Sequence, residues 1–279
     1  MRQYQVEPIT ALGRGLQVLK VLHEMRAASL HDLHLATGLP KSTLTRILFT
    51  CHQQGFVWQR LADGAFLPSH SLLHRGQLDD TDWLVEVASP VLEDLVTKSR
   101  WPSVLSVPRL DYMETLETNS RKAYFDDVRR NPVGYRVNML RSASGRAYLA
   151  FCAATERESV LRRLRQKTTP GHELAHDDAW IERMVRETRA RGCSVRDPDF
   201  GGDYAGGRDV HDDQRMSIAV PIRSSERVIG CINLTWRRRV LSVERVVEQH
   251  RDDLYAAVTE IEGRIRAQAP TVSTSLPGV

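Results

Sequence analysis

One stretch of the chain, residues 29–68, constrains the fold more than any other. Ser29 can cap a short helix, and Gly38 lies where that helix would end in a left-handed conformation. Pro40 then stands at the start of a second helix, where its missing N–H group is no loss. Two short helices joined by so tight a connection are typical of a helix-turn-helix.

The second helix of this pair has one apolar side and one polar side. Its apolar residues recur at spacings of three and four, which predicts a buried stripe of Leu44, Ile47, Leu48 and Cys51. The opposite side carries hydroxyls and cations, which suit the phosphates and base edges of a DNA major groove. The residues predicted to contact DNA from this helix are Lys41, Ser42, Thr43, Thr45 and Arg46.

A two-stranded wing is predicted after the second helix. Residues 56–58 and 65–67 have the composition of strands, and Gly64 between them can form the hairpin turn. Arg60 on this wing is expected to reach the DNA backbone. The alternative is a small structural unit of helices whose polar face is only solvated.

An amphipathic helix is expected before the helix-turn-helix, over residues 13–25. The apolar residues predicted to complete the core from this helix are Leu12, Leu16, Leu19 and Leu22. Arg14 near its start is a further candidate for a phosphate contact, although a solvated arginine is the alternative.

The distribution of charge supports nucleic-acid binding by the N-terminal region. The 279-residue chain has a net charge of +4, and residues 1–75 contain eight Lys and Arg against four Asp and Glu, so the whole excess lies there.

No apolar run approaches the roughly 20 residues of a membrane span, and there is no signal peptide. The four cysteines are scattered without metal-site spacing, which fits free thiols. We therefore expect a cytoplasmic protein without a membrane, metal or cofactor.

The rest of the chain is predicted to mix helices and strands. A helix over residues 79–98, kinked or broken at Pro90, leads into this region. Predicted strands cover residues 103–107, 112–118, 216–222 and 228–236, and predicted helices cover residues 155–167, 177–191 and 242–266. We divide the chain into a winged helix-turn-helix domain (1–75), a linker helix region (76–100), an effector-binding domain (101–266) and a disordered tail (267–279).

The order of these parts resembles the IclR family of bacterial transcriptional regulators. The resemblance covers residues 10–266 and rests on residues 13–16, 40–43, 142–147, 217–221 and 230–234. It implies an α+β fold in which a winged helix-turn-helix is joined by a linker helix to a GAF-like domain, assembled as a homodimer or homotetramer. The residues 101–102, 142–152 and 217–234 resemble most the branch that activates the degradation of aromatic acids such as hydroxyphenylpropionate.

The resemblance also implies a pocket for a small carboxylic acid. Ala143 and Ser144 match the family's turn of small residues, and Ser217, Asn233 and Thr235 match positions that face the ligand from two strands. The family's usual thiol is absent at the Ser217 position, which argues against a glyoxylate-type or pyruvate-type effector. Further candidates are Val104, Ser106 and Met113 for the aromatic side, and Arg121, Arg208 and Arg215 for the carboxylate. The alternative for each is a strand group bonded to the backbone, or a surface arginine.

The sequence therefore predicts a ligand-responsive regulator that binds a double-stranded DNA operator, and not an enzyme. It would control an operon for a hydroxyphenylpropionate-like or benzoate-like acid, as an activator in contact with RNA polymerase. One alternative is a repressor that responds to an aliphatic keto or sugar acid. Another is an architectural DNA-binding protein without an effector, but the glycine-rich segment 201–208, expected to be a lid, argues against it.

A metal enzyme is the remaining rival. His172 and His176 are four residues apart, but no third ligand accompanies them. The sequence has no nucleophile elbow, P-loop or dinucleotide-binding loop either.

Overall fold

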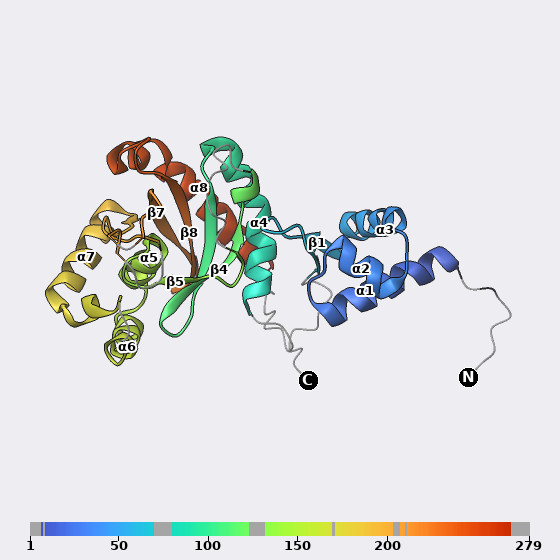
Figure 1. The fold of residues 1–279 in the computed structure, drawn as a ribbon, viewed down its shortest axis with the longest axis horizontal. Coiled ribbons are helices and arrows are strands. Elements are labelled where there is room, and N and C mark those ends of the chain that lie inside the picture. The colour runs from blue at the N-terminus through green and yellow to red at the C-terminus, as the bar shows by residue number, and fades with distance from the viewer. Residues whose placement is uncertain are drawn as a thin grey trace, which may run out of the picture. The chain divides into compact units, whose positions relative to one another are not determined.

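The computed structural model of the chain describes residues 7, 9–69, 80–122, 132–168, 171–202, 207–209 and 211–268. The chain forms two compact units, residues 1–86 and 87–279, and the boundary falls inside the helix α4 (Asp80–Ser99) (Figure 1). Most of the predicted tail lies outside the described residues, as do residues 203–206 of the predicted lid. The last helix, however, continues through residues 267 and 268, which the sequence had placed in the tail.

The first unit is a winged helix-turn-helix. Its elements are α1 (Thr10–Met25), α2 (Leu30–Thr37), α3 (Lys41–Gln53) and an antiparallel wing of β1 (Val57–Gln59) and β2 (Phe66–Pro68). The predicted cap is confirmed, because the Asp32 N–H donates to Ser29 Oγ at 3.2 Å and the Ser29 N–H donates to the Asp32 carboxylate at 2.9 Å. Gly38 ends α2 with φ +70°, as predicted.

The core of this unit differs from the prediction on α1. Val18 and Leu22 are fully buried, but Leu12 and Leu16 are each 57% exposed. The apolar spacing on α1 is helical as expected, yet only the C-terminal half of the helix packs against α2 and α3 within this chain. The N-terminal half therefore presents an apolar side that the unit itself does not cover.

The second unit is built on a six-stranded antiparallel sheet with the strand order β5-β4-β3-β8-β7-β6. The strands are β3 (Ser103–Pro108), β4 (Tyr112–Thr118), β5 (Arg136–Asn138), β6 (Ser194–Val195), β7 (Arg215–Ser224) and β8 (Arg227–Arg237). The helices are α4, which runs unbroken through Pro90, α5 (Ala143–Phe151), α6 (Ala154–Arg165), α7 (Asp178–Arg191) and α8 (Val243–Gln268), with short 3₁₀ turns η2 (Ser120–Lys122) and η3 (Glu173–His176).

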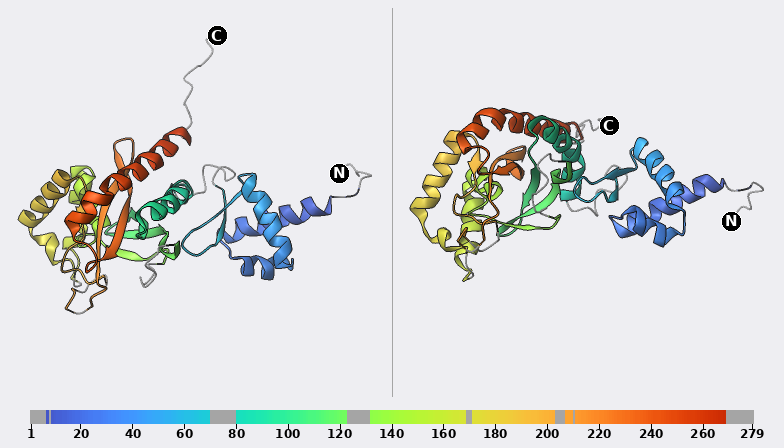
Figure 2. Two further views of the ribbon diagram at one scale, coloured as in Figure 1. Left: turned by 90° about the horizontal axis from the view of Figure 1, so that it is seen from above. Right: turned by 45° about the horizontal axis from the view of Figure 1, so that its top comes forward.

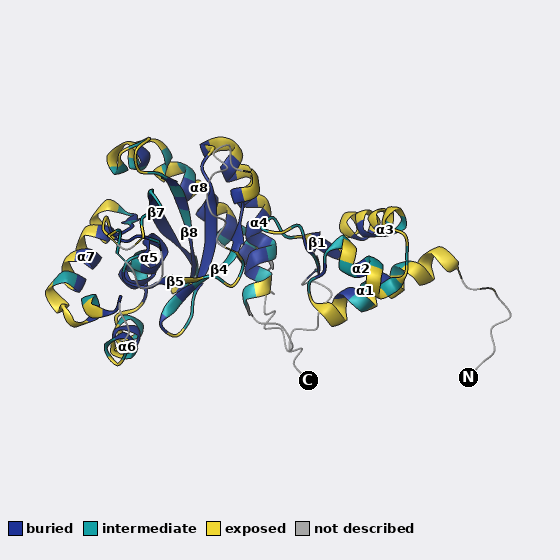
Figure 3. Cartoon of the chain, in the orientation of Figure 1, coloured by how far each residue is buried: buried dark blue, intermediate teal, exposed yellow. Residues whose placement is uncertain are grey.

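Helices cover both faces of this sheet. α5 packs on one face, whereas α4 and α8 lie along the other (Figures 1 and 2). Figure 3 shows the buried residues concentrated in the sheet and on the helix sides that face it. The predicted α+β class, with a winged helix-turn-helix, a linker helix and a GAF-like domain, is confirmed.

A β-bulge in the β3–β4 pair decides which side chains face α5. Leu105 pairs with Glu117 but Ser106 pairs with Thr115, so Leu116 is an extra residue. Thr115 and Thr118 consequently lie on the same face, although they are three residues apart. Glu117 is turned to the α4 face, which a regular alternation would not allow.

The described part of the chain contains no helix that combines the length and the apolar character needed to cross a bilayer.

Candidate functional site

The polar side of α3 is open, as a DNA-contacting surface requires. Lys41, Ser42, Thr45 and Arg46 are exposed, and Thr43 is half-buried. The opposite side of the helix is closed against the core by Leu44, Leu48 and Cys51. The Thr45 hydroxyl donates to the Lys41 carbonyl at 2.9 Å, which leaves its oxygen able to accept a bond from a base edge. The surface thus offers two cations and short hydroxyls from one helix.

The two predicted backbone contacts outside α3 differ from each other. Arg14 is exposed on α1. Arg60 on the wing is held by Asp63, since its Nε and Nη2 atoms donate to the two carboxylate oxygens at 3.0 and 2.6 Å. This fork-shaped ion pair partly neutralises Arg60, so the wing is a weaker phosphate site than the sequence alone suggested.

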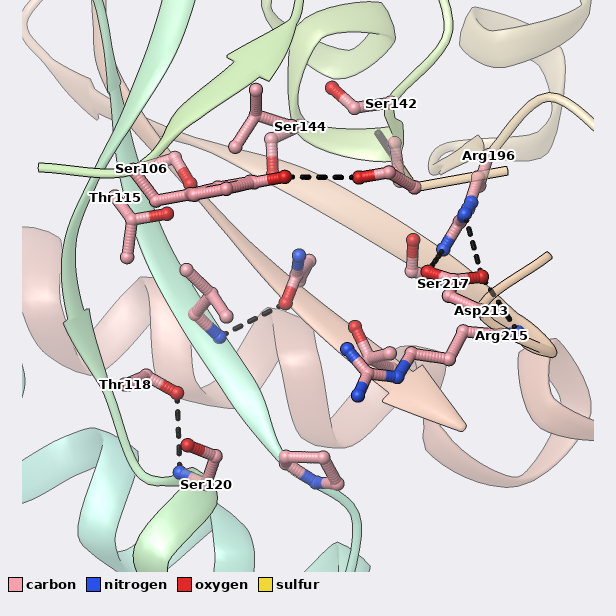
Figure 4. A pocket seen from close by; sticks show the side chains of 18 of the residues that line it. Ser106, Thr115, Thr118, Ser120, Ser142, Ser144, Arg196, Asp213, Arg215 and Ser217 are labelled. Carbon is pink, nitrogen blue, oxygen red and sulfur yellow. Dashed lines mark hydrogen bonds and ion pairs between the residues drawn. The ribbon is translucent and has the colours of Figure 1, made fainter. Parts of the chain in front are cut away.

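A cavity opens between α5 and its face of the sheet in the second unit (Figure 4). The cavity and its mouth hold about 710 Å³ of space not filled by protein atoms. Eight lining residues are serines or threonines: Ser106, Thr115, Thr118, Ser120, Ser142, Ser144, Ser217 and Thr235. The other lining residues are Pro102, Val104, Tyr135, Val137, Ala143, Arg196, Phe200, Gly202, Asp213, Arg215 and Asn233.

One end of the cavity is cationic. Arg196, Asp213, Arg215 and Ser217 lie together there (Figure 4). Arg196 donates to both Asp213 carboxylate oxygens at 2.9 Å. Burial lowers the pKa of both arginines, and the nearby Asp213 carboxylate opposes that shift. Two arginines and one aspartate give this end a net positive charge, which suits a carboxylate.

Several buried polar atoms around the cavity lack a partner. Within the described part of the chain, Thr115 Oγ1, Ser120 Oγ and Arg196 Nε make no hydrogen bond. A buried polar group without a partner costs roughly 1–3 kcal/mol. All three residues line the cavity, so a ligand or water there would remove that cost. Polar atoms at separate points of the wall could bond a ligand with more than one polar group.

The N-terminus of α5 forms part of the wall. Ser142 caps the helix, because the Gly145 N–H donates to its hydroxyl at 3.0 Å. A Cβ atom at Gly145 would lie 2.2 Å from the Met139 carbonyl oxygen, so only glycine allows this turn to pack so closely. Ala143 and Ser144 stand in the first turn, where backbone N–H groups have no partner within the helix.

The structure brings together eight of the eleven residues that the sequence proposed for effector binding. Those that line the cavity are Val104, Ser106, Ala143, Ser144, Arg215, Ser217, Asn233 and Thr235. Asn233 also has a structural bond, because its side-chain oxygen accepts from the Val104 N–H at 3.0 Å. Its position on the wall is thus partly explained by pairing of β3 with β8.

The other three lie elsewhere. Met113 is fully buried in the core under α5, and Arg121 is exposed on η2. Arg208 is bonded to the Asp212 carboxylate and donates to the Arg215 carbonyl at 2.6 Å, so it braces the strand behind the cavity. None of these three is among the described residues that line the cavity, so their roles in effector binding stay predictions.

Sequence reasoning missed Arg196, Tyr135, Thr115, Thr118 and Ser120. Thr115 follows the alternation of β4 and lies on the same face as Met113. Thr118 depends on the bulge and Ser120 on the 3₁₀ turn η2, which no spacing in the sequence reveals. Arg196 follows the two-residue strand β6, which is too short to recognise from its residues. Tyr135 precedes the similarly short β5 and donates from its hydroxyl to the Gly202 carbonyl at 3.1 Å.

The described residues contain no group of three or more His, Cys, Asp and Glu side chains that could hold a metal ion. His172 is buried at 2% exposure, whereas His176 is exposed. These two histidines therefore do not present a common open face.

Comparison with known proteins identifies the first unit. Residues 11–61 match the IclR helix-turn-helix domain. The chain is 26% identical over 193 residues to the transcriptional repressor IclR of Escherichia coli (strain K12), a match that covers 68% of this chain and 69% of that protein. It is 27% identical over 200 residues to the acetate operon repressor of Salmonella typhimurium, with the same coverage of 68% and 69%.

Solved structures extend the similarity to the second unit. An IclR homolog from Microbacterium hydrocarbonoxydans, in complex with 4-hydroxybenzoate, is 25% identical; the match covers 92% of this chain and 99% of that one with a TM-score of 0.52. The Thermotoga maritima IclR is 17% identical, with coverage of 92% and 98% and a TM-score of 0.53, and supports the fold alone.

Proposed function

We propose that this chain is a transcriptional regulator of the IclR family and senses a small carboxylic acid in the cavity of its second unit. The winged helix would bind a double-stranded DNA operator, and the acid would change that binding. The observation that carries this proposal is a cavity with a cationic end and unpartnered buried hydroxyls, in the same chain as an IclR helix-turn-helix. The regulator would act in the cytoplasm and catalyse no reaction. An activating role through RNA polymerase stays a prediction.

An aromatic acid with a hydroxyl group opposite its carboxylate is the effector class that we favour. The carboxylate would lie at the end formed by Arg196 and Arg215, and the ring between Val104 and Val137. The hydroxyl would then reach Thr115 or Ser120, whose oxygens lack partners among the described residues. The similar IclR homolog in complex with 4-hydroxybenzoate supports this class.

A hydroxylated aliphatic acid, such as a sugar acid, is the second candidate. The observation in its favour is the number of hydroxyls on the wall, since eight Ser and Thr residues line the cavity. A sugar acid would use more of them than a single phenol could. The two classes of acid can be separated by experiment, because only an aromatic ring gains affinity from the apolar residues between the two ends of the cavity.

Replacing Thr115 by Val tests the placement of the ligand hydroxyl. Valine keeps the shape of threonine but removes an oxygen that makes no bond within the described protein, so folding should not suffer. We expect 4-hydroxybenzoate to bind about fivefold more weakly to Thr115→Val, because a net hydrogen bond contributes about 1 kcal/mol. Benzoate, which lacks the hydroxyl, should bind equally to both proteins. Calorimetry with benzoate, 4-hydroxybenzoate and gluconate on both proteins measures this.

Each result of that titration has a clear meaning. Binding of gluconate alone would replace the aromatic class with the second candidate. Binding of no acid by the wild-type chain would reject the effector proposal and favour an architectural DNA-binding protein. If Thr115→Val lost the same affinity for benzoate as for 4-hydroxybenzoate, Thr115 would not be the partner of the ligand hydroxyl.

The cavity wall is bonded directly to α4, the helix that crosses the boundary between the two units. Ser89 Oγ donates to Glu117 Oε2 at 2.8 Å, and Asn119 Nδ2 donates to the Leu92 carbonyl at 2.6 Å. Glu117 and Asn119 alternate with the lining residues Thr118 and Ser120. A ligand that moves these lining residues would therefore also shift bonds to α4. We propose this segment as the route by which the acid biases the DNA-binding state.

Replacing Ser89 by Ala tests this route. Ser89 does not line the cavity, so the acid should bind Ser89→Ala within about threefold of its affinity for the wild type. Couplings between sites are typically about 5-fold to 150-fold in affinity, and we expect the variant to lose most of that response to the acid. Gel-shift titrations with and without the acid measure the response. Thr97→Ala, which removes an exposed hydroxyl from the same helix, should keep it; a full response in Ser89→Ala would exclude this route.

Dimer formation through α1 is a further part of the proposal. Ile9, Leu12 and Leu16 are 70%, 57% and 57% exposed. Nothing lies within 4 Å of where a Cβ would stand on Gly13 or Gly15, so a second helix could approach closely. A homodimer or homotetramer would read operator half-sites spaced by helical turns of DNA. Sedimentation of the full chain tests this, and a monomer at micromolar concentration would reject it.

A further inference from the structure

A large apolar side chain stands among the polar residues on the outer side of α3. Phe49 is 60% exposed, whereas phenylalanine is usually buried. Ser42, Arg46, Phe49 and Gln53 are spaced by four, three and four residues, so with 3.6 residues per turn they lie along one side of the helix. All four are exposed, and the buried residues of α3 lie on the opposite side.

Among the described residues, Phe49 takes no part in the core of the first unit. That core consists of residues from the other sides of the helices, including Leu44 and Leu48 of α3. Exposing so large an apolar side chain is unfavourable in the free protein. A contact with another molecule would remove this cost. Ser42 and Arg46, which lie on the same side of α3, are among the residues expected to contact DNA.

The major groove contains one apolar group that such a side chain can recognise. Each thymine presents its C5-methyl group there, and phenylalanine is among the residues that contact it. The other base edges present hydrogen-bond donors and acceptors, which a phenyl ring cannot satisfy. Phe49 lies one turn of helix beyond Arg46, and a helix in the groove can place such positions over neighbouring base pairs.

We infer that Phe49 contacts the C5-methyl group of a thymine in the operator and makes α3 select a T·A pair there. The inference rests on the proposed binding of α3 in the major groove. Arg46 supplies hydrogen bonds and charge on the same surface, and Phe49 supplies apolar discrimination. A cytosine at that position, without the methyl group, would be bound more weakly.

The test removes the methyl group from the DNA and the ring from the protein. Selection from a random duplex pool with the full chain yields the operator sequence. Each thymine is then replaced singly by deoxyuridine, which removes only the methyl group. We expect the wild type to bind about fourfold more weakly at one such position, since a buried methyl is worth about 0.8 kcal/mol. Phe49→Ala should bind the unmodified operator more weakly and show no further loss with that deoxyuridine.

Thr50→Ala is the matched control on the same helix. Its hydroxyl donates to the Arg46 carbonyl at 2.9 Å, and this variant should keep the deoxyuridine effect. The inference is overturned if Phe49→Ala keeps that effect, or if no deoxyuridine weakens binding by the wild type. It is also overturned if Phe49→Ala changes only the sedimentation of the chain, which would assign the ring to a contact between copies. A wild type that selects no sequence at all would instead reject DNA recognition by α3.

Discussion

Arg46→Ala is expected to lower affinity for the operator by about 10-fold to 100-fold. Arg46 is exposed on the outer side of α3, where a guanidinium can bond a guanine edge or a phosphate. Loss of one such contact costs about 1–3 kcal/mol. Gel-shift titration of the variant against the wild type measures the loss. The variant should melt like the wild type, because the Arg46 side chain is exposed.

The salt dependence of binding shows which kind of contact is lost. If Arg46 bonds a phosphate, the slope of log affinity against log salt should become smaller in magnitude by about one in the variant. The loss of affinity should then be similar on all DNA sequences. If it bonds a base, the loss should concentrate on one position of the operator. Lys20→Ala removes an equal charge from the exposed side of α1 and is the control. If Arg46→Ala and Lys20→Ala lost the same affinity for DNA, Arg46 would contribute only through its positive charge and not through a specific contact.

The first unit could be predicted from sequence because its features are local. Ser29, Gly38, Pro40 and Gly64 each determine the backbone within a few residues of themselves. The error on α1 has a different origin. Leu12 and Leu16 fit the apolar spacing of the helix, but the spacing does not say whether the partner surface belongs to the same chain. Only packing shows that they are exposed here.

The cavity was partly predictable for the same reason. Ser217, Asn233 and Thr235 follow the alternation of long, regular strands, so their shared face could be inferred. Thr118 and Glu117 could not be assigned, because the bulge at Leu116 exchanges the faces on which they lie. Strict alternation would have put Glu117 in the cavity beside Thr115. The bulge instead gives the cavity a hydroxyl and gives α4 a carboxylate.

The choice of the carboxylate-binding arginine also depended on the structure. Of the three arginines that were candidates from sequence, Arg215 is the one that lines the described cavity. Arg196 lines it too, but its guanidinium is committed to Asp213 and to the Phe200 carbonyl at 2.7 Å. Removing Arg196 would leave the half-buried Asp213 carboxylate without its bidentate ion pair, which would be destabilising. Arg215 is thus the residue at which effector binding can be tested most directly.

Arg215→Met is expected to weaken binding of the effector acid by about 10-fold to 100-fold. Methionine keeps much of the apolar length of the side chain, and charge-assisted hydrogen bonds contribute about 1.5–3 kcal/mol. The loss should be largest for the carboxylate form, so the corresponding methyl ester or amide should bind both proteins alike. Isothermal titration with the acid and its amide measures both effects.

Arg121→Met is the control for charge, because Arg121 is exposed on η2 and does not line the cavity. It removes one positive charge from the same unit and should leave the affinity for the acid unchanged. The Arg215→Met protein must still bind the operator without the acid, which shows that its fold is intact. Equal acid affinity in Arg215→Met and the wild type would mean that the carboxylate lies elsewhere, and the proposed orientation of the effector would be wrong. If Arg215→Met and Arg121→Met lost the same affinity for the acid, the net charge of the unit would explain the loss, and a contact inside the cavity would not.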